Sequence, residues 1–331
     1  MSRAEPLKVS IAMATYNGGK YLREQLDSFL AQTRLPDELV ITDDCSSDDT
    51  LAILEEFAAS APFEVRWEQN KKNLGYTGNF NQALLNTTGD LVFLSDQDYV
   101  WFPEKLERME RNALDDPEAL VVMNDAALTD GELNDTGLTK LGQIASAGMR
   151  DSSFVMGCCA AVRRELLDLC LPIPAGYKGH DGWIVKMAEG VGRKRVFRDV
   201  LQWYRRHEEN ESQFIANRTT KVTRGMVFRQ SLARVVQGDG QQEQSGASSA
   251  QLRAFLAGVR DARDRSTSPL SDEFNDYVRQ LETRLSALDD RLAVRDKARW
   301  MRLPGVFRLW RKGAYGEFAG AKSAVRDLLF R

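Results

Sequence analysis

The chain is poor in cysteine and histidine and has no long apolar run. It carries four cysteines and two histidines among 331 residues, without CxxC pairs or metal-type cysteine spacing. Reduced, buried thiols in a cytosolic protein are therefore the expectation. No segment, the first residues included, is apolar for long enough to predict a signal peptide or a membrane-spanning helix.

Two common phosphate-binding loops are also missing. Neither GxGxxG nor GxxxxGK[ST] follows the first predicted strand, which gives no support to the usual dinucleotide or P-loop sites. The composition, 43% hydrophobic and 28% charged, is typical of a soluble chain that forms a core. The length allows one large domain, or one domain with a sizeable appendage.

Apolar runs and amphipathic stretches alternate through the first hundred residues. The pattern predicts strands at 7–15, 38–44, 63–70 and 90–96, with helices between them at 20–33, 48–60 and 77–88. This alternation predicts a parallel, doubly wound sheet with covered faces. The pattern is less regular after this region.

Polar residues follow three of the predicted strands, at positions 15–17, 43–44 and 96–98. Ligands bind beyond the carboxyl ends of the strands in such sheets, so we expect the three clusters to converge on one crevice. An acid-rich crevice repels a diphosphate unless a cation such as Mg²⁺ or Mn²⁺ bridges the two. Asp96 and Asp98 point to the same side of an extended chain, which suits either such a site or a solvated turn.

Both histidines stand in polar, aromatic surroundings. His180 precedes Asp181 and Trp183, and His207 ends the strand-like segment LQWYRRH. Asp181 is either the N-cap of the helix that follows or a general base that Trp183 partly shields from water. His207 is either an ordinary surface or core histidine or an additional ligand of a metal or phosphate.

Five segments, taken in order, resemble the family-2 glycosyltransferases, inverting enzymes of the GT-A fold, and among them the bacterial rhamnosyltransferase-type members. The segments are SIAMATYNGGKYLREQLDSFLAQT, VITDDCSSDDT, NLGYTGNFNQALLNTTGDLVFLSDQDYVWFPEKL, HDGW and WYRRH. The resemblance implies a Rossmann-like α/β fold with a mostly parallel central sheet flanked by helices. A catalytic domain is expected at 1–215, with a nucleotide-sugar half to about 103 and an acceptor half from about 104. The C-terminal third lies outside the resemblance. Its two apolar stripes at helical spacing, within 252–259 and 274–292, predict a helical extension at 216–331, and composition indicates a linker at about 237–250.

The resemblance also assigns roles to individual residues. The nucleotide-sugar site that it implies comprises Thr15, Tyr16, Asn17, Asp44, Asn73, Asn79 and Asp96. Within that set, Asp44 would bind the base and Asp96 the ribose or donor sugar. Asp98 and His207 would hold a divalent metal, Mg²⁺ or Mn²⁺, and Asp181 would deprotonate the acceptor. Related members commonly read SDQDDVW, so Tyr99 replaces a third acid here, which puts metal and donor use in question.

The implied reaction is a single displacement with inversion at the anomeric carbon. The donor would be a dTDP- or UDP-sugar, dTDP-rhamnose for example, and the acceptor a glycan or lipid-linked saccharide of a cell-surface polysaccharide. A nucleotidyltransferase is the first alternative, although TYNGGKYL is poor in the basic residues that its phosphate loop needs. A catalytically inactive nucleotide-sugar or carbohydrate-binding protein is the second. No nucleic-acid partner is predicted.

Residues 295–331 are basic and aromatic, although the net charge of the chain is −3. Trp300, Phe307 and Trp310 are interleaved there with arginines. Such a segment can lie on an anionic membrane surface, which would place a cytoplasmic enzyme at the inner face of the cell membrane. It can equally form a helical appendage whose aromatic residues pack on the catalytic domain.

Overall fold

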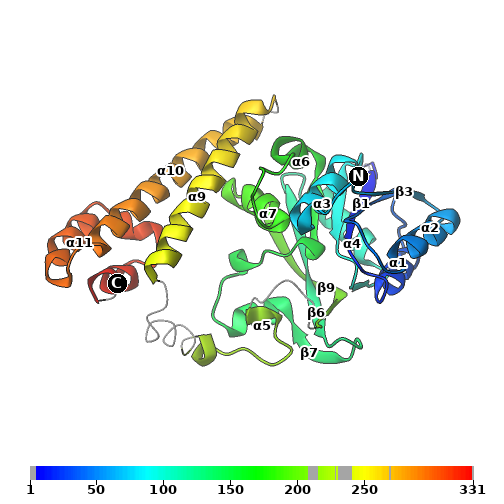
Figure 1. The fold of residues 1–331 in the computed structure, drawn as a ribbon, viewed down its shortest axis with the longest axis horizontal. Coiled ribbons are helices and arrows are strands. Elements are labelled where there is room, and N and C mark those ends of the chain that lie inside the picture. Colours follow the sequence, from blue (N-terminus) through cyan, green and yellow to red (C-terminus); the bar gives the residue numbers. More distant parts are fainter. Residues whose placement is uncertain (1–4, 208–214, 228, 230–240, 268–269, 330–331) are drawn as a thin grey trace. The chain divides into compact units, whose positions relative to one another are not determined.

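Four parallel strands form the first half of a nine-stranded sheet (Figure 1). They are β1 (Val9–Thr15), β2 (Glu38–Asp43), β3 (Glu64–Gln69) and β4 (Leu91–Ser95), in the order β3-β2-β1-β4. The computed structural model describes residues 5–207, 215–227, 229, 241–267 and 270–329. All three strand pairings in this half are parallel, as the sequence predicts.

Helices pack on both faces of these strands. On one face, alternate residues of β1, β2 and β4 join a buried apolar cluster with α1 (Leu22–Leu30), α2 (Thr50–Ser60) and α4 (Lys105–Asp115). On the other face, Thr42 donates a hydrogen bond of 2.8 Å to the carbonyl of Asn79 in α3 (Gly75–Leu85). Because side chains alternate along a strand, Ile41 and Thr42 serve opposite layers. This part is doubly wound.

The second half of the sheet is mixed. It contains β5 (Val100–Trp101), β6 (Val121–Thr129), β7 (Asp135–Thr139), β8 (Ala160–Arg163) and β9 (Lys194–Arg205), with α5 (Lys140–Ser146), α6 (Arg164–Cys170) and α7 (His180–Gly190). Strand β8 lies antiparallel between β4 and β6, and β9 is parallel to β6. Strand β8 runs opposite to β4, and β6 runs opposite to β8, so β6 and its parallel neighbour β9 run in the same direction as β4. The carboxyl ends of β4 and β9 therefore lie at the same edge of the sheet.

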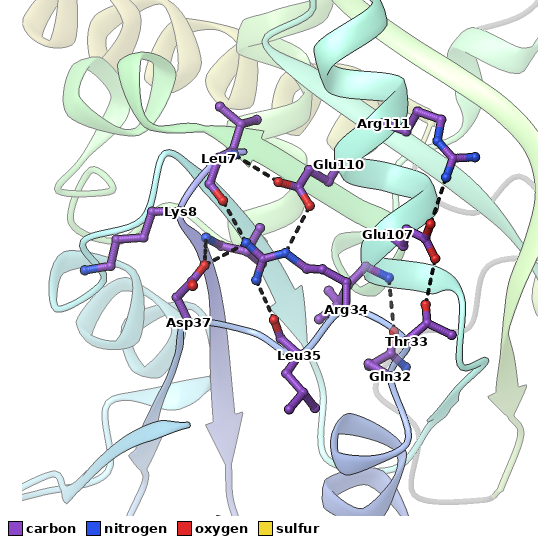
Figure 2. Close-up of polar contacts among 12 residues, drawn as sticks. Leu7, Lys8, Gln32, Thr33, Arg34, Leu35, Asp37, Glu107, Glu110 and Arg111 are labelled. Carbon is purple, nitrogen blue, oxygen red and sulfur yellow. Dashed lines mark hydrogen bonds and ion pairs between the residues drawn. The ribbon is translucent and has the colours of Figure 1, made fainter. Parts of the chain in front are cut away.

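A partly buried polar network closes the opposite edge, near the start of β1 (Figure 2). The guanidinium of Arg34 donates to Glu110 at 2.9 Å, to Asp37 at 2.8 Å and to the carbonyl of Leu7 at 2.7 Å. Glu110 in turn accepts from the Leu7 amide, and Asp37 accepts from the Val9 amide. These contacts tie the segments before β1 and β2 to α4, which fixes the frame from which the strands run toward the site.

The C-terminal unit is helical. The chain divides into two units, Met1–Arg224 and Gly225–Arg331. In the second unit, α9 (Gln241–Arg265) and α10 (Leu270–Arg295) lie side by side (Figure 1, yellow and orange). The helical stripes predicted there bury Phe255, Val259 and Phe274. Two shorter helices follow, α11 (Arg302–Arg311) and α12 (Ala321–Leu329).

The predicted linker at 237–250 is wrong for residues 241–250, which form the first turns of α9. Glutamine and alanine are good helix formers, and here they extend the helix whose later turns carry the buried Phe255 and Val259. Residues 237–240 lie outside the described part of the chain. Among the described helices, none is long and apolar enough to cross a membrane. Three of the four cysteines, Cys158, Cys159 and Cys170, are buried, and Cys45 is partly exposed.

Candidate active site

The carboxyl ends of β1 and β4 are joined by one side chain, that of Gln97. Its amide oxygen accepts from the Tyr16 backbone amide at 2.8 Å, and its amide nitrogen donates to the Tyr16 carbonyl at 3.0 Å. The turn after β1 comes very close to this amide, because a Cβ atom at Gly18 would lie 2.3 Å from the Gln97 oxygen. Two of the predicted polar clusters therefore meet, as expected from the sheet topology. Sequence reasoning gave Gln97 no role.

The polar cluster after β2, at 43–44, meets the cluster after β1, at 15–17. Thr15 donates to the carboxylate of Asp43 at 3.0 Å, and the Asp44 amide donates to the Thr15 carbonyl at 2.9 Å. Asn17 has a φ of 47° and accepts from the Ser47 amide at 2.9 Å. Asparagine tolerates this left-handed conformation better than most residues. The three strand ends thus form one crevice rim, on which the side chain of Tyr16 is half exposed.

Asp44 organises the loop that leads into α3. Its carboxylate accepts from the amides of Leu74 and Gly75, each at 2.8 Å, and from the side chain of Asn70 at 2.9 Å. The side chain of Asn73 donates to the Asp44 carbonyl at 3.1 Å. Asp44 is 2% exposed and holds this loop from beneath, whereas Asn73 is exposed at the rim, next to the N-terminus of a helix.

Asn79 does not face the crevice, so its expected position near a sugar diphosphate is corrected. It is 2% exposed, its amide nitrogen donates to the Thr15 carbonyl at 3.0 Å, and its oxygen accepts from Asn70 at 2.9 Å. Asn79 belongs to the face of α3 that packs on the sheet, together with the buried Phe80 and Ala83. Its role is to support the end of β1 from behind.

Three carboxylates share the crevice after β4. Burial raises the pKa of Asp96 to about 8, and the negative charges of Asp98 and Asp181 contribute to the rise. The ammonium group of Lys105 opposes it. Lys105 is itself buried, donates to the Cys158 carbonyl at 2.7 Å and lies 3.8 Å from the Trp101 ring centre. This buried counter-charge escaped sequence reasoning, because lysine in a helix usually faces water.

Asp98 and His207 are in direct contact. The imidazole Nε2 lies 2.9 Å from the Asp98 carboxylate, and the His207 ring packs against Tyr21 at 5.0 Å between centres. Arg205 holds the segment by donating to the Asp98 carbonyl at 3.0 Å. The parallel direction of β9 and β4 brings these residues together from opposite ends of the catalytic unit.

The pair fits part of a divalent metal site. One carboxylate and one imidazole at 2.9 Å can face a common ion, and both are ordinary metal ligands. No group of three or more histidine, cysteine, aspartate or glutamate side chains that could hold a metal occurs among the described residues.

Asp181 lies in the first turn of α7, and the N-cap position belongs to Gly179. The capping alternative for Asp181 is therefore wrong in register. Gly179 has a φ of 94°, which favours glycine, and its amide donates to Thr77 at 2.9 Å. The turn is closely packed, because a Cβ atom at Gly157 would lie 2.9 Å from Nε2 of His180 and 3.4 Å from Cβ of Asp181. Asp181 is thus held in position at the crevice.

Trp183 does not shield Asp181, contrary to the sequence interpretation. Its indole is fully buried and donates to the Cys170 carbonyl at 2.9 Å. Residues two apart on a helix point to different faces, so Asp181 and Trp183 diverge. His180, the residue before Asp181, makes the aromatic contact there instead of Trp183. Its ring stacks on Phe80 at 3.7 Å between centres, and burial lowers its pKa to about 4.

Tyr99 is a core residue. It is 6% exposed and stacks on Tyr204 at 4.5 Å between ring centres. A third residue that the sequence interpretation missed is Arg206, whose Nη1 is buried without a hydrogen-bond partner among the described residues. The sequence feature that could have identified Arg206 is its place directly before His207.

Comparisons with known proteins define the class. Residues 10–170 match the family model for glycosyl transferase family 2. The chain is 29% identical over 226 residues to an uncharacterized glycosyltransferase of Nostoc sp., alr2836, covering 65% of this chain and 70% of that protein. It is 36% identical over 107 residues to the dTDP-rhamnosyl transferase RfbG of Shigella flexneri, covering 31% of this chain and 36% of RfbG.

A solved structure shares the fold. The mannosyltransferase PcManGT from Pyrobaculum calidifontis, in complex with GDP-Man and Mn²⁺, aligns with a TM-score of 0.51 at 18% identity, over 97% of this chain and 78% of that chain. Residues 10–170 therefore form a glycosyl transferase family 2 domain, and the chain is a glycosyltransferase with a GT-A catalytic unit followed by C-terminal helices. The family resemblance and the fold class predicted from the sequence are confirmed.

Proposed function

We propose that this glycosyltransferase is metal-dependent and inverting, and that it moves a sugar from a nucleoside-diphosphate donor to a hydroxyl group. One observation carries the proposal. The Asp98–His207 pair, Asp96 and the helix-borne Asp181 lie together beyond the end of β4, beside the rim of strand ends that carries the half-exposed Tyr16. Such a rim suits a nucleoside, and such an acidic floor suits metal-assisted departure of a diphosphate.

The donor half of the reaction uses the strand ends. Thr15, Tyr16 and Asn17 line the nucleoside site, Asp44 binds the base, and Asn73 lies near the sugar diphosphate. Asp96 contacts the ribose or the donor sugar. The family membership and the GDP-Man bound to PcManGT support a nucleotide-sugar donor.

The metal side of the reaction uses Asp98 and His207. When bound, a divalent cation would neutralise charge that develops on the leaving diphosphate. The two residues hold and orient that charge at the edge of β4 and β9, and Arg205 fixes the backbone of Asp98. The Mn²⁺ in the PcManGT complex supports a divalent ion.

The acceptor half of the reaction uses Asp181. Its carboxylate takes the proton of the acceptor hydroxyl while the oxygen attacks the anomeric carbon from the side opposite the diphosphate, which inverts that centre. A base must be held at hydrogen-bond distance from the proton that it removes. The tight contacts of Gly157 and the cap at Gly179 supply that constraint.

The proposal for the donor sugar rests on similarity to one relative, and the proposal for the acceptor rests on the family resemblance. The similarity to RfbG favours rhamnose carried by dTDP, with a UDP-sugar as the next candidate. The acceptor is a glycan or a lipid-linked saccharide, assembled into a cell-surface polysaccharide. We place the enzyme in the cytoplasm, attached to the inner face of the cell membrane through residues 295–331.

A thermal-shift screen tests the proposal. The protein is heated with dTDP-rhamnose, UDP-sugars and GDP-mannose, each with and without Mn²⁺. A donor at 100 times its Kd should add about 2.7 kcal/mol to the free energy of unfolding, which raises Tm by roughly 5–10 °C for a unit of this size. Asp98→Ala should remove the effect of Mn²⁺, and the exposed control Asp115→Ala should keep it. A screen without a stabilising nucleotide sugar would contradict the proposal.

A further inference from the structure

An apolar stripe runs along one exposed face of the C-terminal unit. Trp300, Leu303, Phe307 and Trp310 are 82%, 63%, 61% and 50% exposed. Their spacing of three, four and three residues places them on one face of α11 and the short turn of 3₁₀-helix before it (Arg299–Met301). We call these four residues the α11 stripe.

The α11 stripe is separate from the face that packs this helix. Val306 and Leu309 of α11 are buried in a small apolar cluster with Val294, Tyr315 and Ala324. The core of the unit is therefore complete without the stripe. Four large apolar side chains in a contiguous exposed row are uncommon on a protein with no use for them.

The stripe is also presented rigidly. The buried guanidinium of Arg302 donates to the carbonyls of Lys297 at 2.8 Å and Arg295 at 2.6 Å. Arg291 and Asp327 form a buried two-bond ion pair at 2.8 and 3.0 Å. These contacts anchor α11 and α12 to the end of α10.

A close helix approach fixes the remaining freedom. A Cβ atom at Gly305 would lie 2.7 Å from Val294, so α11 packs directly on α10 at this point. The outward direction of the stripe is consequently set by the core of the unit.

Exposed basic side chains share the C-terminal segment with the stripe. They are Lys297, Arg299, Arg308, Arg311, Lys312, Lys322 and Arg326. Two exposed acids, Asp296 and Glu317, share the same segment. A second copy of the chain would bring like charges together, which opposes self-association through this face. An anionic lipid leaflet offers both an apolar layer for the stripe and phosphates for the arginines.

We infer that the α11 stripe is a membrane-docking surface that inserts its four apolar side chains below the head groups of an anionic leaflet. The helix lies in the plane of the surface. Arg308 and Arg311, on the flank of the stripe, contact lipid phosphates. This inference identifies the surface behind the membrane attachment in the proposed function and rests on that part of it, but it does not depend on the donor or the reaction.

Vesicle co-sedimentation of the full chain tests the inference. The vesicles contain phosphatidylcholine alone or mixed with phosphatidylglycerol, at low and high salt. The intact chain should bind the anionic vesicles, more weakly at high salt. Leu303→Glu with Phe307→Glu should reduce binding at least tenfold, because two inserted side chains become charged. The control Leu85→Glu changes a 47% exposed leucine of the catalytic unit and should bind within twofold of the intact chain.

A second variant keeps the test independent of folding. Arg308→Gln with Arg311→Gln changes two exposed side chains and should reduce binding to anionic vesicles several-fold while weakening its salt dependence. Failure of the intact chain to bind, or unchanged binding by the Leu303→Glu, Phe307→Glu variant, would overturn the inference. So would a dimer in size-exclusion chromatography that this variant disrupts. Donor-induced thermal shifts measured on the same proteins report separately on the proposed function.

Discussion

A single methyl group at Gly18 should loosen the junction between β1 and β4. The added Cβ would lie 2.3 Å from the Gln97 amide oxygen and 2.6 Å from its Cδ. The obstructing atoms are the end of a flexible side chain, so Gln97 can swing away while the backbone keeps its path. It would then lose both of its hydrogen bonds to Tyr16.

The expected cost follows from those two bonds. Each contributes about 1 kcal/mol to the free energy of unfolding, so Gly18→Ala should lower it by about 2 kcal/mol, or roughly thirtyfold in the folding equilibrium. Donor affinity should fall as well, because Tyr16 lies on the proposed nucleoside rim.

Chemical denaturation of a double-mutant cycle measures this coupling. Gly18→Ala and Gln97→Ala should each cost about 2 kcal/mol, and the double variant should cost no more than either, since both remove the same bonds. Gly182→Ala is the matched control, because its Cβ would meet no atom within 4 Å. Additive losses in the double variant would refute the bridging role of Gln97.

Three further predictions concern the base, its support and acid stability. Asp181→Asn should lower kcat by a factor of about 10²–10⁴ while leaving donor binding by calorimetry nearly unchanged; full activity would remove Asp181 from the mechanism. Gly157→Ala should push on His180 and Asp181 and lower kcat more than Gly182→Ala does, and equal rates would deny the packing constraint. Burial opposes ionisation of Glu38, but hydrogen bonds led by that from Ser10 lower its pKa from 4.5 to about 2. The ionised group therefore stabilises the fold by about 3 kcal/mol above pH 4.5, and this stability is lost as the pH falls from 4.5 toward 2. Denaturation midpoints of Glu38→Gln should lack that acid sensitivity, and an unchanged pH profile would contradict it.

The parallel half of the fold could be predicted because its information is local. Apolar runs, helical spacing and polar strand ends each occupy a short stretch, and parallel direction brings the ends of β1, β2 and β4 together. The crevice rim around Tyr16 followed from this. The contact between Asp98 and His207 was expected only from the family resemblance, because it depends on β8 reversing direction between β4 and β6, which no local pattern records.

The errors at individual residues have a common physical cause. Asn79 was assigned by the family resemblance and Trp183 by its neighbours in sequence, but the face of a helix decides which residues each of them meets. Asn79 lies on the sheet-packing face of α3, and Trp183 lies on the core face of α7. The segment at 241–250 was taken for a linker from its composition, although the helix that follows extends through it.

The product that the enzyme releases tests the central claim most directly. The stabilising donor from the thermal-shift screen is incubated with an acceptor extract, and the released nucleotide is separated by chromatography. The account predicts nucleoside diphosphate, released with an inverted sugar linkage by the intact enzyme and at a greatly reduced rate by Asp181→Asn. Release of pyrophosphate would instead indicate a nucleotidyltransferase, and release of nucleoside diphosphate at the same rate by Asp181→Asn would contradict the proposed base.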